Sequence, residues 1–209
     1  MNLGLIIKRI FDLIVALFAL LLLWPLLMII SLVIKAQSPG PVFYRGVRTG
    51  LNGKPFRIFK FRTMVVNAES IGGPSTALKD PRLTPIGKFL RKYKLDEPPQ
   101  LFNIISGEMS FVGPRPQVEM YTRLYSGEEK LILTVTPGLT DYASIYFINL
   151  DALLGEKDVD QKYLHEIEPQ KNMLRIKYAK ENSFWIDMKI LFMTIIQMLK
   201  IRSKWNIGN

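Results

Sequence analysis

Cysteine is absent from this chain of 209 residues, and histidine occurs only once, as His165. Without cysteine, the chain forms no disulfide and has no thiolate nucleophile. A single histidine is too little for a histidine-rich metal site. Catalytic acids, bases and nucleophiles must therefore be sought chiefly among aspartate, glutamate, lysine, serine, threonine and tyrosine.

Charged residues are missing from the whole stretch between Leu13 and Ile34, which Asp12 and Lys35 close at its two ends. This stretch reaches the roughly 20 residues that cross the core of a bilayer. Pro25 lies at its middle, where proline removes a backbone hydrogen bond and kinks a helix. Both flanks are basic, so the positive-inside rule assigns no orientation. The sequence predicts a membrane helix and leaves open whether it spans the bilayer or bends at Pro25 and returns.

The net charge of +10 is concentrated in one region of the chain. Between Lys35 and Leu95 there are thirteen lysines and arginines against two acids, Glu69 and Asp80, which gives +11 and leaves −1 for the rest. A basic block beside an apolar anchor suits an anionic membrane surface or a phosphate-bearing substrate. Nucleic acid is a third ligand class, and a merely solvated surface is the plainest interpretation.

Apolar residues crowd together again between Phe184 and Ile201, where Asp187 and Lys189 interrupt them. This pattern is too polar for a membrane span. It predicts either an amphipathic helix at the membrane interface or a packed core helix. We divide the chain accordingly into a membrane helix (1–36), a globular domain (37–183) and a C-terminal amphipathic helix with a tail (184–209).

The globular domain is expected to combine short strands with helices. Val42–Tyr44 predicts a short strand, and alternating apolar and basic residues from Pro55 to Arg62 predict a basic strand. Gly72–Ser75 predicts a loop. Thr84 and Pro85 are typical of the first residues of a helix. Apolar residues follow at helical spacing and predict its buried face: Ile86, Phe89, Leu90 and Tyr93. The expected fold class is an α-rich α/β domain.

Two adjacent acids, Asp96 and Glu97, precede Pro98 and Pro99 at the predicted start of a further helix. Acids at this position commonly cap free amides and gain about 0.3–1 kcal/mol from the helix dipole. A carboxylate held ionised there is also a credible nucleophile toward phosphorus. Its neighbour offers a ligand for Mg²⁺, which needs few protein ligands when it also binds phosphates. Capping and catalysis therefore both remain open.

Cations that could hold a phosphate lie on both sides of these acids. Arg91 and Lys92 come just before them. Arg115 follows between Pro114 and Pro116, and two prolines make a stiff loop that fixes the guanidinium in space. A fixed guanidinium is suited to bidentate phosphate binding.

Together these segments resemble the bacterial sugar transferases known as monotopic phosphoglycosyl transferases. The match runs in the same order from residue 8 to about residue 140, and the order of the segments makes it specific. Its segments are Lys8-Arg9 with Asp12, the helix broken at Pro25, Lys60–Met64, Leu95–Leu101, Met109–Pro116 and Pro137–Thr140.

The resemblance implies a transferase that moves a sugar 1-phosphate from a UDP-sugar to undecaprenyl phosphate and releases UMP. Such enzymes initiate glycoconjugate assembly at the cytoplasmic face of the bacterial inner membrane, and their N-terminal helix is re-entrant. Residues 37–183 would be the cytoplasmic catalytic domain. No nucleic-acid partner is implied, and a homo-oligomer is left open.

The resemblance also assigns roles to individual residues. Asp96 would be the nucleophile that forms a covalent phosphosugar intermediate, and Glu97 would bind Mg²⁺, the implied cofactor. Basic residues would bind the substrate phosphates: Arg91 and Arg115, with Lys60 and Arg62 as weaker candidates.

Three positions depart from the family pattern. Trp24 precedes Pro25 where relatives often have serine, and Asp141–Ser144 replaces a common Gly-Trp-Ala-Gln. Ile148 stands near the place of an arginine that helps to hold the nucleotide. These departures leave the sugar and nucleotide specificity open.

Two other functions compete with the transferase. A non-enzymatic membrane scaffold would use the basic block to bind anionic lipids. A membrane-tethered nucleic-acid binder would use the aromatic and basic residues of Phe56–Arg62.

Overall fold

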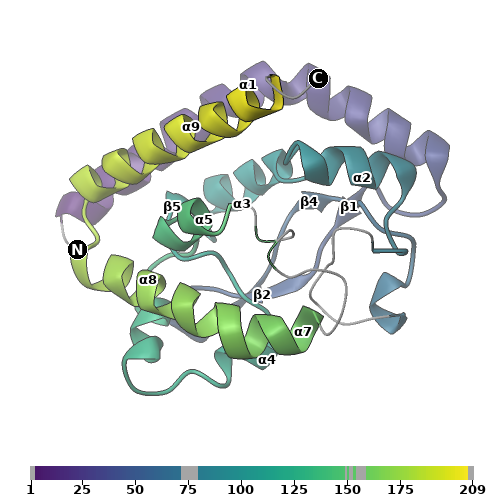
Figure 1. Cartoon of the computed structure of the whole chain (residues 1–209). Helices are drawn as coiled ribbons and strands as arrows, with labels where there is room; N and C mark the ends of the chain where they lie inside the picture. The colour runs from purple at the N-terminus through teal and green to yellow at the C-terminus, as the bar shows by residue number, and fades with distance from the viewer. Residues whose placement is uncertain (1–2, 72–79, 149, 151–152, 154–158, 207–209) are drawn as a thin grey trace.

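The computed structural model describes residues 3–71, 80–148, 150, 153 and 159–206 (Figure 1). The predicted loop Gly72–Ser75 lies outside these residues. Helices dominate, and the strands are two or three residues long. The α-rich α/β fold class with short strands is therefore confirmed.

Helix α1 (Leu3–Gln37) contains Pro25 and changes direction along its length as it arches over the rest of the molecule (Figure 1). By length and composition it is the one described helix able to cross a membrane. Most of its large apolar side chains are exposed, among them Phe18, Leu22 and Trp24. Ser31 donates a hydrogen bond of 2.7 Å to the Leu27 carbonyl, a contact that often accompanies a bent helix.

Both ends of α1 are bound to the same globular body. Near its start, the Arg9 guanidinium donates hydrogen bonds to the carbonyls of Ile104 (2.5 Å) and Ile105 (2.8 Å). At its end, the Gln37 side chain accepts a hydrogen bond of 3.2 Å from the amide of Ile86. The middle of α1 packs on the core through the fully buried Ala16.

Helix α9 (Phe184–Asn206) runs beside α1 (Figure 1), and the rings of Phe11 and Phe184 meet edge to face at 5.7 Å. Its inner side belongs to the core, because Ile190 is fully buried. Its outer side exposes large apolar residues, and Trp185 is 80% exposed. The core-helix interpretation is therefore confirmed for the inner side, and the membrane-interface interpretation stays a prediction.

Three pairs of short strands hold the middle of the molecule together. β1 (Phe43–Tyr44) pairs antiparallel with β4 (Lys60–Phe61), and β2 (Val47–Thr49) pairs antiparallel with β3 (Pro55–Arg57). β5 (Ser110–Val112) and β6 (Gly138–Thr140) are parallel. The predicted strand at Val42–Tyr44 is therefore confirmed, shortened by one residue.

The single strand predicted from Pro55 to Arg62 is wrong, because the chain there forms β3 and β4 in different sheets. Buried Asn103 explains the break. The Oδ1 of Asn103 accepts a hydrogen bond of 2.8 Å from the amide of Phe59. Its Nδ2 donates a hydrogen bond of 2.9 Å to the carbonyl of Arg57. These two backbone groups bond to a side chain instead of to a neighbouring strand.

Helix α2 (Pro85–Lys92) begins as predicted, since the Thr84 hydroxyl accepts the amide of Gly87 at 3.0 Å. A Cβ atom on Gly87 would lie 1.9 Å from the Thr63 carbonyl oxygen, so only glycine allows this close approach. The predicted buried face is only half right. Leu90 is buried, whereas Phe89 and Tyr93 are largely exposed, because the core reaches only one edge of this short helix.

The remaining turns and helices surround the strands. They are η1 (Leu51–Gly53), η2 (Ala68–Ser70), η3 (Pro98–Gln100), α3 (Leu101–Ser106), α4 (Glu119–Thr122), η4 (Gly127–Thr134), α5 (Tyr142–Tyr146), α7 (Val159–Lys162), the π-helical turn η5 (Tyr163–Ile167) and α8 (Glu168–Glu181). In Figure 1, α7 and α8 lie on the side of the molecule away from α1.

Candidate active site

Asp96 lies between the end of α2 and the turn η3, with its backbone attached to strand β4. Its carbonyl accepts the amide of Phe61 at 2.9 Å. The residue is only 5% exposed, yet its Oδ1 has no hydrogen-bond partner. The Lys60 ammonium lies 4.0 Å from Oδ2. A buried carboxylate with one unpartnered oxygen is unusual, since buried polar atoms are generally hydrogen-bonded.

Glu97, the next residue, is held by two cations. Lys60 donates to its Oε1 at 3.1 Å, and the Arg115 guanidinium contacts both carboxylate oxygens. Burial opposes ionisation of Glu97, but Arg115 and Lys60 outweigh it and lower its pKa. Lys60 thus lies between the two acids, and its own pKa is lowered by burial despite both of them.

Arg115 reaches Glu97 because two glycines allow its loop to lie against strand β6. The Gly113 amide donates to the Thr140 carbonyl at 3.0 Å, and the Gly138 amide donates to the Pro114 carbonyl at 3.1 Å. A Cβ atom on Gly138 would come within 2.2 Å of the Gly113 nitrogen. The guanidinium also donates to the Leu139 carbonyl at 3.2 Å. The segment Pro137–Thr140 therefore positions Arg115.

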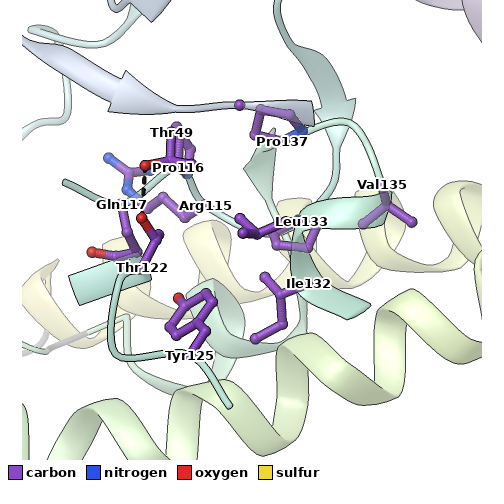
Figure 2. Close-up of a pocket in the computed structure, with 12 residues that line it drawn as sticks. Thr49, Arg115, Pro116, Gln117, Thr122, Tyr125, Ile132, Leu133, Val135 and Pro137 are labelled. Atoms are coloured by element: carbon purple, nitrogen blue, oxygen red, sulfur yellow. Dashed lines mark hydrogen bonds between the residues drawn. The ribbon is translucent and has the colours of Figure 1, made fainter. Parts of the chain in front are cut away.

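A small pocket lies behind this loop, and Figure 2 shows side chains from several elements converging on it. The hydroxyls of Thr49 and Thr122 share a hydrogen bond of 2.8 Å, drawn as a dashed line in Figure 2. The backbone carbonyl of Gln117, two residues after Arg115, accepts a hydrogen bond of 2.9 Å from the amide of Thr49. These bonds, together with the two prolines, hold the backbone of the Arg115 loop.

Arg91 lies in the last turn of helix α2, which ends shortly before Asp96. Its Nε donates to the Thr63 hydroxyl at 3.2 Å, and its charge acts on Asp96. Burial raises the pKa of Asp96, although Lys60 and Arg91 act in the opposite direction. Of the four predicted phosphate-binding residues, Lys60 and Arg115 therefore contact the two acids, and Arg91 acts on Asp96 through its charge.

Arg62 is directed elsewhere. Its guanidinium donates to the carbonyls of Pro39 (2.5 Å) and Ser38 (3.1 Å) and to the Ser38 hydroxyl (2.9 Å). It thus holds the chain just after α1. Its predicted role in phosphate binding remains a prediction, and the structure adds a structural role.

Neither acid acts as a helix cap, although both lie directly before η3 and α3 as predicted. Glu97 occupies the N-cap position of η3 without a side-chain cap bond. Asp96 is not the N-cap residue of η3 or of α3, and its Oδ1 has no partner among the residues that the structure describes. The capping interpretation of these acids therefore loses its support.

Comparison with known proteins places this site in a family. The sequence pattern described as bacterial sugar transferase matches residues 3–201. The chain belongs to the bacterial sugar transferase family.

This bacterial sugar transferase has several curated relatives. It is 38% identical over 196 residues to the UDP-glucose:undecaprenyl-phosphate glucose-1-phosphate transferase of Escherichia coli (strain K12). The aligned segment covers 92% of this chain and 40% of that protein. It is 34% identical over 199 residues to the UDP-N-acetylgalactosamine-undecaprenyl-phosphate N-acetylgalactosaminephosphotransferase of Aeromonas hydrophila, with coverage of 92% and 44%. It is also 36% identical over 194 residues to the uncharacterized sugar transferase EpsL of Bacillus subtilis (strain 168), with coverage of 93% and 88%.

The chain spans about two fifths of the Escherichia coli relative and of its Klebsiella pneumoniae counterpart. It spans most of EpsL. What this bacterial sugar transferase shares with the longer proteins is therefore the segment that carries Asp96, Glu97 and Arg115.

The two acids fit a magnesium ion. Among the described residues there is no cluster of three or more potential metal-ligating side chains. Mg²⁺ needs only one or two carboxylates when waters and substrate phosphates complete its shell. The lowered pKa of Glu97 keeps that carboxylate ionised, as a metal ligand must be. The unpartnered Oδ1 of Asp96 is a second oxygen available to a cation.

Sequence reasoning named Lys8 and Asp12 as part of the family resemblance but gave them no role in the site. The Asp12 carboxylate accepts the amide of Phe111 at 3.2 Å and so attaches α1 to strand β5. The Lys8 ammonium donates to the Val112 carbonyl at 2.9 Å and pairs with Asp187 of α9. Lys8 and Asp12 lie four residues apart, on one face of a helix, and this spacing was the available signal.

Proposed function

We propose that this protein is a phosphoglycosyl transferase that moves a sugar 1-phosphate from a UDP-sugar to undecaprenyl phosphate and releases UMP. The observation that carries the proposal is the buried carboxylate of Asp96, which has one unpartnered oxygen, lies 4.0 Å from the Lys60 ammonium and is acted on by the charge of Arg91. The relatives from Escherichia coli and Aeromonas hydrophila are named for this reaction with different UDP-sugars. The enzyme initiates the assembly of a polysaccharide or another glycoconjugate.

The transfer takes place in two steps at Asp96. First, a carboxylate oxygen attacks the sugar-bearing phosphorus of the UDP-sugar, and the bond from this phosphorus to the bridging oxygen breaks. UMP leaves with the electron pair, and the sugar phosphate stays on Asp96 as an acyl phosphate. Next, a phosphate oxygen of undecaprenyl phosphate attacks the same phosphorus. The bond to Asp96 breaks, and the carboxylate is regenerated.

The cations around Asp96 support both steps. Arg115 and Arg91 bind the phosphate oxygens, on which negative charge is concentrated in the transition state. Lys60, 4.0 Å from the Asp96 carboxylate, favours its ionised form. Glu97 would hold Mg²⁺, which would supply further positive charge to the diphosphate when bound.

The same proposal includes a re-entrant α1 at the cytoplasmic face of the inner membrane. Arg9 and Gln37, near opposite ends of α1, both bond to the globular body, which supports their lying on one side of the bilayer. Pro25 and the bend in Figure 1 support a helix that enters one leaflet and returns. The exposed outer face of α9 would then lie at the membrane interface.

The reaction is tested with the full-length protein in nanodiscs, a panel of UDP-sugars and undecaprenyl phosphate. We expect one or a few UDP-sugars to give continuous UMP release that stops when magnesium is chelated. Without the lipid phosphate, we expect a burst of about one UMP per enzyme, as covalent catalysis requires. Absence of UMP release from every UDP-sugar would contradict the proposed reaction.

The arrangement of α1 is tested by cysteine labelling, for which the cysteine-free chain is a clean background. Asn2 lies outside the described residues, so Leu3 and Ala36, both exposed, are changed to cysteine one at a time. A membrane-impermeant maleimide added to sealed inverted vesicles should label both variants equally. Labelling of only one of them would show that α1 spans the membrane.

A further inference from the structure

The chain around Lys60 is paired with a neighbouring strand segment on one edge. On that edge the Ile58 amide donates a hydrogen bond of 3.0 Å to the Gly46 carbonyl. The Arg62 amide likewise donates a hydrogen bond of 2.9 Å to the Val42 carbonyl. Successive amides along a strand point to opposite edges. The two amides that flank Lys60 therefore face the other edge, where β4 pairs with no further strand among the described residues.

A single stretch of the chain, from Asp96 to Asn103, supplies the acceptors on this open edge. The Asp96 carbonyl accepts a hydrogen bond of 2.9 Å from the Phe61 amide. The Oδ1 of Asn103 accepts a hydrogen bond of 2.8 Å from the Phe59 amide. Lys60 is thus held on both sides by the stretch that carries the acids it contacts.

The Asn103 side chain is itself fixed by its bonds. It is fully buried, and its Nδ2 donates to the Arg57 carbonyl at 2.9 Å and to the Glu108 carboxylate at 2.7 Å. Glu108 is in turn attached to the backbone of Asn103, because its amide donates to the Asn103 carbonyl at 3.0 Å. A side-chain amide bonded at both ends cannot rotate without leaving buried polar groups unsatisfied. Asn103 therefore offers the Phe59 amide an acceptor at a fixed place.

The position of the Lys60 ammonium matters most for Asp96. Its Nζ is 3.1 Å from Oε1 of Glu97 and 4.0 Å from Oδ2 of Asp96. Glu97 has a second cation in Arg115. Within the part of the chain that the structure describes, Lys60 is the one cation at ion-pair distance from Asp96. A displacement of about 1 Å at a reacting group can cost a factor of about 100 in rate.

We propose that Asn103 is a positioning residue for the first step of the transfer. It holds the chain at Phe59 so that the Lys60 ammonium stays between the two acids. This inference rests on the proposed function, because it assumes that Asp96 is the nucleophile. Asn103 acts through Lys60 and does not touch the substrate. Without its side chain, Lys60 is held on the open edge by the Asp96 carbonyl alone.

The experiment measures formation of the sugar-phosphate adduct by the full-length protein in nanodiscs. The UDP-sugar that the wild type uses is supplied without lipid phosphate, and the reaction is followed by rapid quench. At saturating UDP-sugar, Asn103→Ala should slow adduct formation at least tenfold. The half-saturating concentration should change less than threefold, because the loop of Arg115 has its own contacts. A loss of folded enzyme alone would lower the amplitude of the burst and leave its rate constant unchanged.

A double variant shows whether Asn103 acts through Lys60. In a Lys60→Met background, Asn103→Ala should slow adduct formation less than threefold, because the lysine that it positions is already absent. Asn172→Ala is the matched control. Asn172 is also buried and bonded at both ends, since it donates to Glu129 at 2.9 Å and accepts from Arg175 at 2.8 Å. This control should lower Tm and leave the rate constant within twofold of the wild type.

Hydrogen exchange gives a readout that does not depend on turnover. The peptide that contains Phe59 should exchange faster in Asn103→Ala than in the wild type and should be unchanged in Asn172→Ala. Unchanged exchange in Asn103→Ala would overturn the proposal. Slowing of adduct formation by the same factor with and without Lys60 would overturn it as well. Failure of the proposed function would appear separately, as absence of UMP release from every UDP-sugar.

A second variant covers the case in which Asn103→Ala fails to fold. Glu108→Ala removes one acceptor of the Asn103 Nδ2 at a half-buried position. It should slow adduct formation at least threefold when Lys60 is present and should have no such effect in Lys60→Met. In that case, an unchanged rate constant in Glu108→Ala would overturn the proposal.

Discussion

Two buried aspartates of the basic region, Asp80 and Asp96, have opposite surroundings. The Asp80 carboxylate is fully engaged by Arg82, which donates to its two oxygens at distances from 2.6 to 3.2 Å. Arg82 lowers the pKa of Asp80. Asp96 has one unpartnered oxygen and a lysine at 4.0 Å, and burial raises its pKa.

This difference separates a structural acid from a reactive one. A carboxylate whose lone pairs are all occupied contributes to stability and is a poor nucleophile. A carboxylate that is buried, close to cations and incompletely bonded costs stability and remains available for reaction. Positive charge is near both acids, so charge alone does not distinguish them. The hydrogen bonds that each oxygen receives do distinguish them.

The largest expected effect is that of Asp96→Asn. Removing the nucleophile should lower turnover at least about 1,000-fold and abolish the labelled sugar-phosphate adduct. The adduct is measured by incubation with a radiolabelled UDP-sugar and gel analysis. Asp80→Asn is the matched control and should still form the adduct. Full turnover by Asp96→Asn would rule out the covalent role of Asp96.

The next effect in size is that of Arg115→Lys. Lysine keeps the positive charge but loses the fork that binds Glu97 and the Leu139 carbonyl together. We expect kcat/KM for the UDP-sugar to fall about 100-fold, measured by UMP release. An unchanged kcat/KM would show that Arg115 only orders the loop.

Asp80→Asn should act on stability instead of on chemistry. The substitution removes the carboxylate that binds the Arg82 guanidinium through both of its oxygens, at a cost of about 2 kcal/mol in the free energy of unfolding. This should lower Tm by about 5 °C in a thermal unfolding scan. An equal loss of stability in Asp96→Asn would contradict the distinction between the two acids.

Arg62→Met extends the comparison to the cations. Because Arg62 bonds to Ser38 and Pro39 after α1, the variant should lose about 1–2 kcal/mol of stability. The KM for the UDP-sugar should change less than threefold. A large rise in KM with unchanged Tm would instead support phosphate binding by Arg62.

The smallest effect is a pH dependence that differs between the two acids. The raised pKa of Asp96 means that its contribution favours folding at low pH and is lost as pH rises through that pKa. Between pH 7 and pH 5, acidification should therefore stabilise the wild type relative to Asp96→Asn, by at most about 1 kcal/mol. The lowered pKa of Asp80 keeps it ionised throughout, so the deficit of Asp80→Asn should not change. Chemical unfolding at the two pH values compares these differences.

Much of the candidate site could be read from local patterns. The start of α2 at Thr84-Pro85, the two acids before η3 and the stiff loop around Arg115 depend on residues close together in the chain. The break between β3 and β4 could not be read in this way, because it depends on Asn103, more than forty residues away. The direction of the Arg62 side chain could not be read from local patterns either. It depends on the carbonyls of Ser38 and Pro39, which lie more than twenty residues earlier in the chain, just after the end of α1.

By itself, the sequence determined the long apolar helix, the concentration of positive charge and the family to which the chain belongs, because these features follow from composition and residue order. Only the tertiary structure decided which cations meet Asp96 and how Arg82 comes to bind both oxygens of Asp80. The physical reason is that pKa values and unpartnered atoms depend on burial and on distances of a few ångströms. Those distances are set by contacts such as Gly113 against Gly138, which join segments far apart in the chain.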